Sequence, residues 1–289
     1  MQQVLADFQS SLNRVRNLAN DASANTPAAL SNPLLLERHE TALLAVVVML
    51  AGFFESFLRG TAEAFIDGVN QQNYPFLTLK PTIQYAHFQG GGLLLDAIGG
   101  KTRSPRHSWT TTDAFDLVRR LASVQTTTGY ELVWEAFAET RGNPDSDVIR
   151  IFLKRFGVAA PLEALAAQIG YSAQSLGVAL DNFIVVRNEC AHTGSTNNQP
   201  QPSDVLAYCD LLEKIATGII AVLTTHQVCT GVGVASGTSS SATLPSGQQR
   251  SQLIPSTTQQ PAVSMSVQGA GIWGRLIAKV KRLCRISGP

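Results

Sequence analysis

The hexapeptide Arg187-Asn188-Glu189-Cys190-Ala191-His192 combines residues that suit chemistry on a phosphodiester. Arg187 offers a rigid guanidinium fork that matches a phosphate group, and His192 is of the residue type best suited to accept or donate a proton near neutral pH. Asn188 adds an amide that could orient either the phosphate or the imidazole ring. The same residue types also favour the end of a helix, where Arg and His meet the last carbonyl groups. The hexapeptide alone leaves both interpretations open.

An apolar helix is predicted to carry the hexapeptide at its end. Ser172 is of a type that caps helices, and the apolar residues after it recur at helical spacing: Leu176, Leu180, Phe183, Ile184 and Val186. A polar loop follows the hexapeptide, and Ser203-Asp204 is predicted to open the last long apolar helix of the core. The motif would therefore lie between two apolar helices.

The remaining core also has the pattern of an all-α helical bundle. Helical spacing predicts a helix over residues 2–19, followed by a linker of small residues. Asn32-Pro33 has the pattern of an N-cap with proline at the first helical position, and this helix should reach about Asp67, broken or bent near Gly52 or Gly60. Its uncharged stretch covers only residues 42–54, which favours a buried core helix over a membrane span.

The middle of the chain is predicted to be a set of shorter elements. Glycines make residues 70–110 look like loops and short turns, and helical patterns return at 112–123, 130–140, 146–156 and 161–169. No alternating strand pattern stands out anywhere in the sequence. The fold class we predict is therefore an all-α helical bundle.

Three domains are predicted: a helical domain at 1–230, a disordered linker at 231–270 and a basic amphipathic tail at 271–289. The linker is rich in Ser, Thr, Gln and Pro, and such a segment buries too little apolar surface to become ordered. The tail has an apolar helical stripe with five basic residues, namely Arg275, Lys279, Lys281, Arg282 and Arg285. Residues 272–286 are accordingly expected to contact a membrane surface or a partner, with RNA as the competing explanation.

No cofactor and no metal site are expected. The segment from Leu95 to Thr102 ends like a phosphate-binding P-loop, but Leu95 stands where that loop needs glycine. Asp145 and Asp147 follow Asn143-Pro144, as charges at a helix N-terminus do.

The net charge is +1, the four cysteines form no CxxC pair, and the first residues lack the pattern of a signal peptide. We therefore predict a cytoplasmic protein, with peripheral membrane contact through the tail.

The pattern R-N-x-x-A-H at the end of a penultimate helix resembles the HEPN superfamily of α-helical ribonucleases. Arg187, Asn188 and His192 fill its signature places, and Ala191 with Gly194 fits its common ending. The segment LLLERHETALLAVVVMLAGFFESFLRG at 34–60 looks like the long apolar, Glu-containing helix of these proteins. Within the superfamily the chain is most similar to the RiboL-PSP-type branch, whose members carry extra helices between the conserved parts.

The resemblance implies an endoribonuclease that needs no metal. A ribose 2′-OH would attack the adjacent phosphate and leave a 2′,3′-cyclic phosphate, with Arg187, Asn188 and His192 as the catalytic residues. Two proton transfers are easiest with two histidines, so a homodimer with two facing motifs is expected. The alternative is a HEPN-type module that binds RNA, a nucleotide or another partner without cleavage.

A role as a toxin or antiphage defence effector is a hypothesis from the same resemblance, with an antitoxin or other regulator as partner. HEPN toxins paired with small nucleotidyltransferases carry a tyrosine two places after the histidine. Gly194 occupies that position in this chain. The resemblance therefore gives no support to silencing by nucleotide addition at this motif.

Overall fold

The structure is a computed structural model that describes residues 1–98, 111–124, 129–140, 142–193 and 199–230. The predicted linker and tail, and Gly194, lie outside these residues. The described chain belongs to one compact unit, Met1–Thr230. Its elements are α1 (Gln2–Leu30), α2 (Pro33–Gln72), the 3-10 helix η1 (Phe76–Thr78), α3 (Pro81–Ile98), α4 (Thr111–Ser123), the 3-10 helix η2 (Trp134–Ala136), α5 (Ser146–Arg155), α6 (Pro161–Ile169), α7 (Ala173–Thr193) and α8 (Pro202–Thr225).

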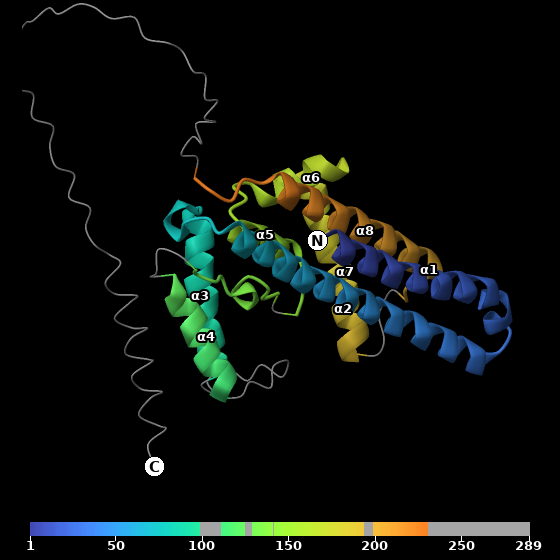
Figure 1. Cartoon of the computed structure of the whole chain (residues 1–289). Helices are drawn as coiled ribbons and strands as arrows, with labels where there is room; N and C mark the ends of the chain where they lie inside the picture. Colours follow the sequence, from blue (N-terminus) through green and yellow to red (C-terminus); the bar gives the residue numbers. More distant parts are fainter. Residues whose placement is uncertain (99–110, 125–128, 141, 194–198, 231–289) are drawn as a thin grey trace, which may run out of the picture. The chain divides into compact units, whose positions relative to one another are not determined.

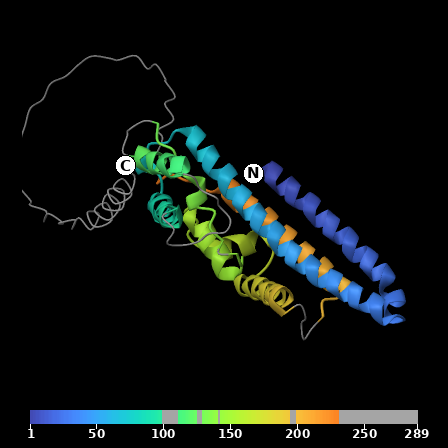
Figure 2. The ribbon, with the colours of Figure 1, turned by 90° about the horizontal axis from the view of Figure 1, so that it is seen from below.

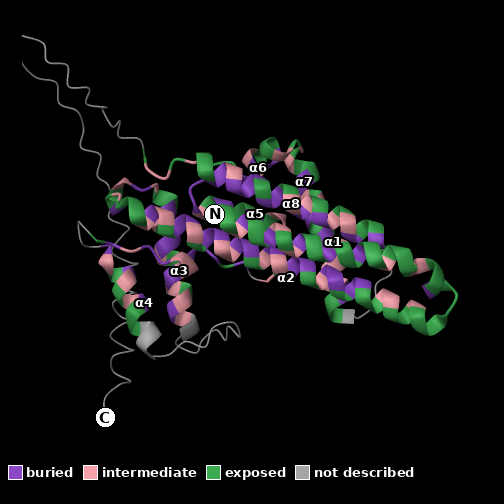
Figure 3. Cartoon of the chain, turned by 45° about the vertical axis from the view of Figure 1, so that its right-hand side comes forward, coloured by how far each residue is buried: buried purple, intermediate pink, exposed green. Residues whose placement is uncertain are grey.

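The predicted all-α fold class is confirmed. In the part of the chain that the structure describes, helices are joined by loops, and the only β-type pairing is an isolated antiparallel bridge between Leu79 and Cys229. Helices α1, α2 and α8 run side by side (Figures 1 and 2). The turn between α1 and α2 is largely exposed, whereas residues on the facing sides of the three helices are buried (Figure 3). These helices form the core on which α7 packs through α2.

Aromatic and ionic contacts hold the three long helices together. The ring of Phe8 in α1 lies 6.0 Å from Phe54 and 5.0 Å from Phe57 of α2, measured between centroids. The Arg16 guanidinium in α1 contacts Asp210 at 2.8 Å and Glu213 at 2.6 Å in α8. Since aromatic pairs and buried apolar side chains dominate core energetics, this packing gives α7 a rigid support.

Helix α2 is long and apolar enough to cross a membrane, judged by length and composition alone. Half of its most apolar window is buried inside the protein, and Val47, Leu50 and Phe54 have no exposed surface. Core helices pass the same test of composition. We therefore interpret α2 as a core helix, in line with the sequence-based expectation.

Two predictions about the first helices were wrong. The expected small-residue linker after residue 19 is helical, because α1 continues to Leu30 through alanine-rich sequence and buries Ala29. Helix α2 is not broken at either glycine, and it continues five residues past the predicted end at Asp67. A Cβ at Gly60 would lie 3.0 Å from Val4 Cγ1, so this glycine permits close contact with α1. The predicted cap is confirmed, since Asn32 Oδ1 accepts from the Leu34 N–H at 3.0 Å.

The loop predicted at 70–110 was wrong over residues 81–98, with residues 99–110 lying outside the described residues, and the helix predicted at 130–140 was also wrong. Residues 81–98 form helix α3 in spite of their glycines, because other segments pack closely against it. Residues 130–140 contain only η2, since tertiary contacts hold their backbone in a non-helical form. Asn70 of α2 accepts from the Leu132 N–H at 2.8 Å and donates to the Leu132 carbonyl at 3.1 Å. Leu132 and Val133 are fully buried.

The other predicted helices are confirmed within a few residues. Helices α4, α5 and α6 occupy the segments predicted at 112–123, 146–156 and 161–169. Helix α8 begins at Pro202, one residue before the predicted Ser203, and its N-cap is Gln201. Asp204 contributes to a capping box, because its carboxylate accepts from the Gln201 N–H at 2.8 Å.

Gly90→Ala is expected to destabilise the protein. A Cβ at Gly90 would lie 2.1 Å from the Ala136 carbonyl oxygen and 2.6 Å from Ala136 Cα, so η2 would have to move away from α3. Overpacking of this kind typically costs about 1–3 kcal/mol. Gly92→Ala is the matched control, because nothing lies within 4 Å of its added Cβ and alanine favours a helix over glycine. Urea unfolding should show a lower midpoint for Gly90→Ala alone, and equal midpoints would contradict this account.

Candidate functional site

Helix α7 carries the hexapeptide in its last two turns. Ser172 starts the helix as predicted, since its hydroxyl accepts from the Ser175 N–H at 3.0 Å. Leu176, Leu180 and Phe183 are fully buried, and the Phe183 ring lies 5.1 Å from that of Tyr208 in α8. The apolar side of α7 is thereby fixed against the bundle. The hexapeptide inherits this fixed orientation because it continues the same helix.

Arg187 and His192 lie on different sides of α7. Five residues of a regular α-helix turn through about 500°, so the two side chains leave the axis about 140° apart. Their burial agrees: Arg187 is half-buried, with a fully buried Nε atom, whereas His192 is exposed. Asn188 lies between them around the axis, one turn before His192. Among the described residues, Arg187 therefore reaches the side of α7 that carries His192 through its hydrogen bond to Asn188.

Two amide oxygens hold the Arg187 guanidinium. Its Nη1 donates to Asn188 Oδ1 at 2.9 Å and to Asn143 Oδ1 at 3.0 Å. In the described chain, Arg187 forms no ion pair with a carboxylate, and its buried Nε has no hydrogen-bond partner. Asn143 is the residue of this candidate site that sequence reasoning missed, because Asn-Pro before a helix indicates only a helix start.

The segment that carries Asn143 is fixed to α7 by further hydrogen bonds. Ser146, the first residue of α5, donates to the Asp181 carboxylate of α7 through its backbone N–H at 2.9 Å and its hydroxyl at 3.0 Å. Asp145 caps α5, as predicted for a charge at a helix start, by accepting from the Val148 N–H at 2.8 Å. Asn143 therefore approaches Arg187 from a segment with little freedom to move.

This arrangement suits an anion. The oxygens of both amides are used by one guanidinium nitrogen, so the unused hydrogen-bonding groups around Arg187 are mainly N–H donors. Because Arg187 pairs with no carboxylate among the described residues, its positive charge remains available to attract an anionic ligand. A phosphate accepts parallel N–H bonds from a guanidinium and matches this set of donors.

His192 and Cys190 differ in the chemistry that their side chains can support. The His192 side chain makes no hydrogen bond with any described residue and is free to meet a ligand. Burial raises the pKa of the Cys190 thiol, which keeps it protonated near neutral pH and unsuited to act as a nucleophile. Over the described residues, no group of three His, Cys, Asp or Glu side chains could hold a metal ion. Of the residues near the motif, His192 is the best placed for proton transfer.

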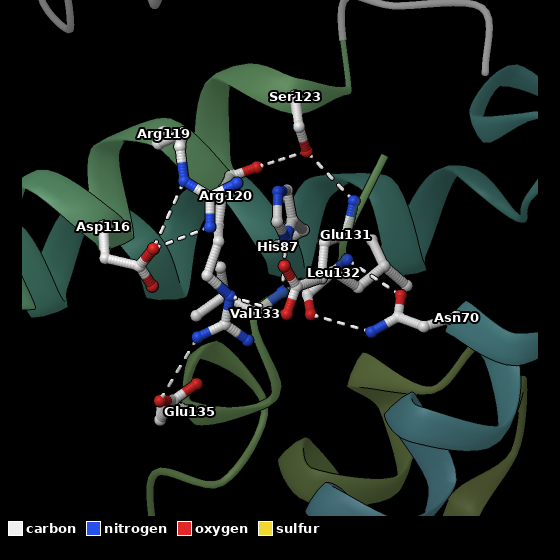
Figure 4. Close-up of polar contacts among 10 residues, drawn as sticks. All are labelled: Asn70, His87, Asp116, Arg119, Arg120, Ser123, Glu131, Leu132, Val133 and Glu135. Atoms are coloured by element: carbon white, nitrogen blue, oxygen red, sulfur yellow. Dashed lines mark hydrogen bonds and ion pairs between the residues drawn. The ribbon is translucent and has the colours of Figure 1, made fainter. Parts of the chain in front are cut away.

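A second polar cluster lies between α3, α4 and the segment around η2 (Figure 4). The buried His87 accepts from the Val133 N–H through Nδ1 at 3.2 Å, so the neutral ring carries its proton on Nε2. Arg120 Nε lies 3.0 Å from Glu131, and its Nη1 lies 3.6 Å from Glu135. Burial lowers the pKa of His87 to about 4, and the charge of Arg120 adds to this effect. Since His87 has no exposed surface, we interpret the cluster as structural.

His87 is expected to make the protein less stable in acid. Its pKa is about 4 when folded and about 6.5 when unfolded, so the unfolded chain binds more protons between these values. The free energy of unfolding should therefore fall as the pH drops from about 6.5 to about 4, by roughly 3 kcal/mol.

A substitution separates this effect from other titrations, including that of His226, whose pKa burial also lowers. In His87→Asn the amide oxygen can replace Nδ1 as acceptor for Val133 without titrating. Urea midpoints measured from pH 7.5 to 4.5 should fall less steeply for His87→Asn than for the wild type. Equal slopes would mean that His87 does not resist protonation.

Comparison with known proteins finds one related family. The RiboL-PSP-HEPN family matches the chain over residues 7–224, which includes the hexapeptide and the helices that position it. No curated protein matches the chain, and no solved structure does.

Proposed function

The chain belongs to the RiboL-PSP-HEPN family, and we propose that it is an endoribonuclease that needs no metal ion. Family membership supports a nuclease or RNA-related module. The observation that carries the finer proposal is the Arg187 guanidinium, held by two amide oxygens with no carboxylate partner among the described residues. Such a group favours a phosphate, and the exposed His192, one turn beyond Asn188, is of a residue type that can transfer protons.

In the proposed reaction the ribose 2′-OH attacks the adjacent phosphorus, and the bond to the 5′-oxygen breaks. His192 accepts the proton of the 2′-OH or donates one to the leaving 5′-oxygen, and a second group serves the other transfer. Negative charge grows on the phosphorane oxygens, where the unused N–H groups of Arg187 donate hydrogen bonds. Asn188 holds Arg187 toward the His192 side of α7.

A second copy of the chain is the best source of the second histidine. Val178, Val185 and His192 are seven residues apart and share one exposed face of α7. The two valines are 54% and 55% exposed, which is unusual for apolar side chains on a core helix. A two-fold axis near this face would bring the two His192 side chains to one cleft. We propose that α7 pairs with α7 of a second copy.

Val185→Asp is expected to convert a dimer into monomers and to abolish most cleavage. It would place a charge opposite its own copy across the two-fold axis, where like charges repel and lose water contacts. Leu77→Asp is the control, because Leu77 is 83% exposed in η1, away from α7. Light scattering at micromolar concentration should give a dimer for the wild type and for Leu77→Asp. A wild-type monomer that still cleaves RNA would contradict the proposed pairing.

The deciding experiment incubates the purified protein with mixed RNA in EDTA. Cleavage should continue, leave 2′,3′-cyclic phosphate ends and spare substrates in which hydrogen replaces the 2′-OH. Each result follows from internal attack by the 2′-OH, with protein side chains in place of a metal. Strict dependence on Mg²⁺, or cleavage of 2′-deoxy substrates, would overturn the proposal.

The second candidate function is RNA binding without cleavage. The angular separation of Arg187 and His192 on one helix favours it if the chain stays monomeric, because one chain then presents the two groups on different sides. The wild type and His192→Ala would in that case bind RNA equally, and both would leave it intact in the EDTA experiment.

A further inference from the structure

We infer that Asn143 is a positioning residue for Arg187, acting from outside the hexapeptide. The inference rests on the proposed function, since it concerns the same site. Asn143 precedes Arg187 by 44 positions and comes from the segment before α5, yet its Oδ1 accepts from Arg187 Nη1 at 3.0 Å. The hexapeptide therefore depends on a part of the chain that its own pattern does not include.

The two amides hold the guanidinium from different elements. Asn188 belongs to α7, next to Arg187, and follows any motion of that helix. Asn143 belongs to another segment, so its hydrogen bond fixes Arg187 relative to the rest of the bundle. A guanidinium with both contacts on Nη1 cannot rotate without losing one of them. Its Nη2 atom consequently keeps a fixed direction for a phosphate.

A neutral acceptor is the right partner for this task. A carboxylate at the same place would pair with Arg187 and compete with the substrate phosphate. The amide oxygen accepts a hydrogen bond without neutralising the charge, and its NH₂ group remains available as a donor. Asparagine at position 143 thus orients Arg187 and leaves the site attractive to an anion.

The backbone around Asn143 is well suited to this role. Pro144 is buried, and the Asp145 N–H donates to the Asn143 carbonyl at 2.8 Å. Ser146 is bonded twice to Asp181, six residues before Arg187 on α7. The segment is therefore fixed to the helix whose arginine it holds. Positioning groups on rigid supports set active-site geometry more accurately than groups on free loops.

The test compares RNA cleavage by Asn143→Ala, Asn143→Asp and Asn13→Ala proteins with the wild type. Asn143→Ala should lower kcat about 10–100-fold with little change in KM, because a misdirected guanidinium loses transition-state contacts first. Asn143→Asp keeps an acceptor but adds a charge, so it should mainly raise KM. Asn13→Ala is the control, since the exposed Asn13 of α1 likewise accepts from an arginine, Arg16, at 3.2 Å, and has no contact to Arg187 among the described residues. It should retain most of the wild-type kcat.

A double-mutant cycle shows whether Asn143 acts through Arg187. In an Arg187→Ala background, Asn143→Ala should cause almost no further loss, because its partner is already absent. Independent losses that multiply would overturn the inference, as would wild-type kcat in Asn143→Ala. Both results leave the proposed function intact.

Failure of the proposed function is recognised separately, by a wild type that leaves RNA uncleaved. Binding of a labelled single-stranded RNA then replaces cleavage as the measurement. Asn143→Ala should weaken this binding in the wild-type background but not in the Arg187→Ala background. Unchanged binding in both backgrounds would overturn the inference as well.

Discussion

A His192→Ala protein is expected to fold normally and to cleave RNA about 10²–10⁴-fold more slowly than the wild type, the usual cost of losing a general acid–base group. The side chain is exposed, lies in the last turn of α7 and makes no hydrogen bond with the described residues. Since alanine is also a good helix former, the substitution should leave the free energy of unfolding almost unchanged. A large loss of cleavage would then report chemistry rather than folding.

The measurement is single-turnover cleavage of a labelled RNA in EDTA, with urea unfolding of the same preparations. His39→Ala is the matched control, because His39 is a partly exposed histidine on a different helix, α2. It should cleave like the wild type. Full activity in a folded His192→Ala protein would exclude His192 from the reaction and leave RNA binding as the better account of the site.

Local sequence signals predicted the helices well where capping residues or prolines mark the residue at which a helix begins. Asn32 and Ser172 cap the helices that the sequence assigned to them, and Pro161 begins α6 at the predicted residue. These positions depend on backbone groups within a few residues, which a single sequence displays. Their success explains why the all-α class and the helix carrying the hexapeptide could be predicted.

Tertiary contacts decided the segments that were predicted wrongly. The glycines of α3 favour a loop by local propensity, but Gly90 and Gly91 lie where η2 and Leu121 of α4 approach the helix most closely. Residues 130–140 have helical spacing, yet the Asn70 side chain is hydrogen-bonded to both the N–H and the carbonyl group of Leu132. Such contacts join residues 30 to 62 positions apart, which periodicity does not reveal.

The candidate site shows the same division. Arg187, Asn188 and His192 could be chosen from the sequence, because their chemistry and spacing form a recognisable pattern. The contact that orients Arg187 could not, because Asn143 lies 44 positions earlier in the chain and is not part of the pattern. The structure turns Arg187 toward Asn188 and Asn143 and leaves His192 on another side of α7.

An Arg187→Lys protein is expected to bind RNA with nearly the wild-type dependence on salt and to cleave it about 10²–10³-fold more slowly, the usual cost of losing a donor to developing charge. Lysine keeps the positive charge, so the electrostatic part of binding remains. Its single ammonium group cannot contact Asn143 and Asn188 and also hold further N–H groups in a fixed direction toward a phosphate, as Arg187 does with Nη2. The defect should therefore appear in kcat rather than in affinity.

Arg150→Lys is the matched control, because Arg150 is an exposed arginine of α5 whose one ion pair within the described part of the chain is with Asp147, three residues away. RNA affinity at several salt concentrations, single-turnover cleavage and urea unfolding should be measured for both proteins. Arg150→Lys should match the wild type throughout. Wild-type cleavage by Arg187→Lys would show that charge alone suffices at this position, and the fixed guanidinium direction would then have no catalytic role. A loss of RNA affinity equal to the loss of cleavage would instead assign Arg187 to substrate binding. An interaction that is equally strong in the bound substrate and in the transition state changes KM and leaves kcat unchanged.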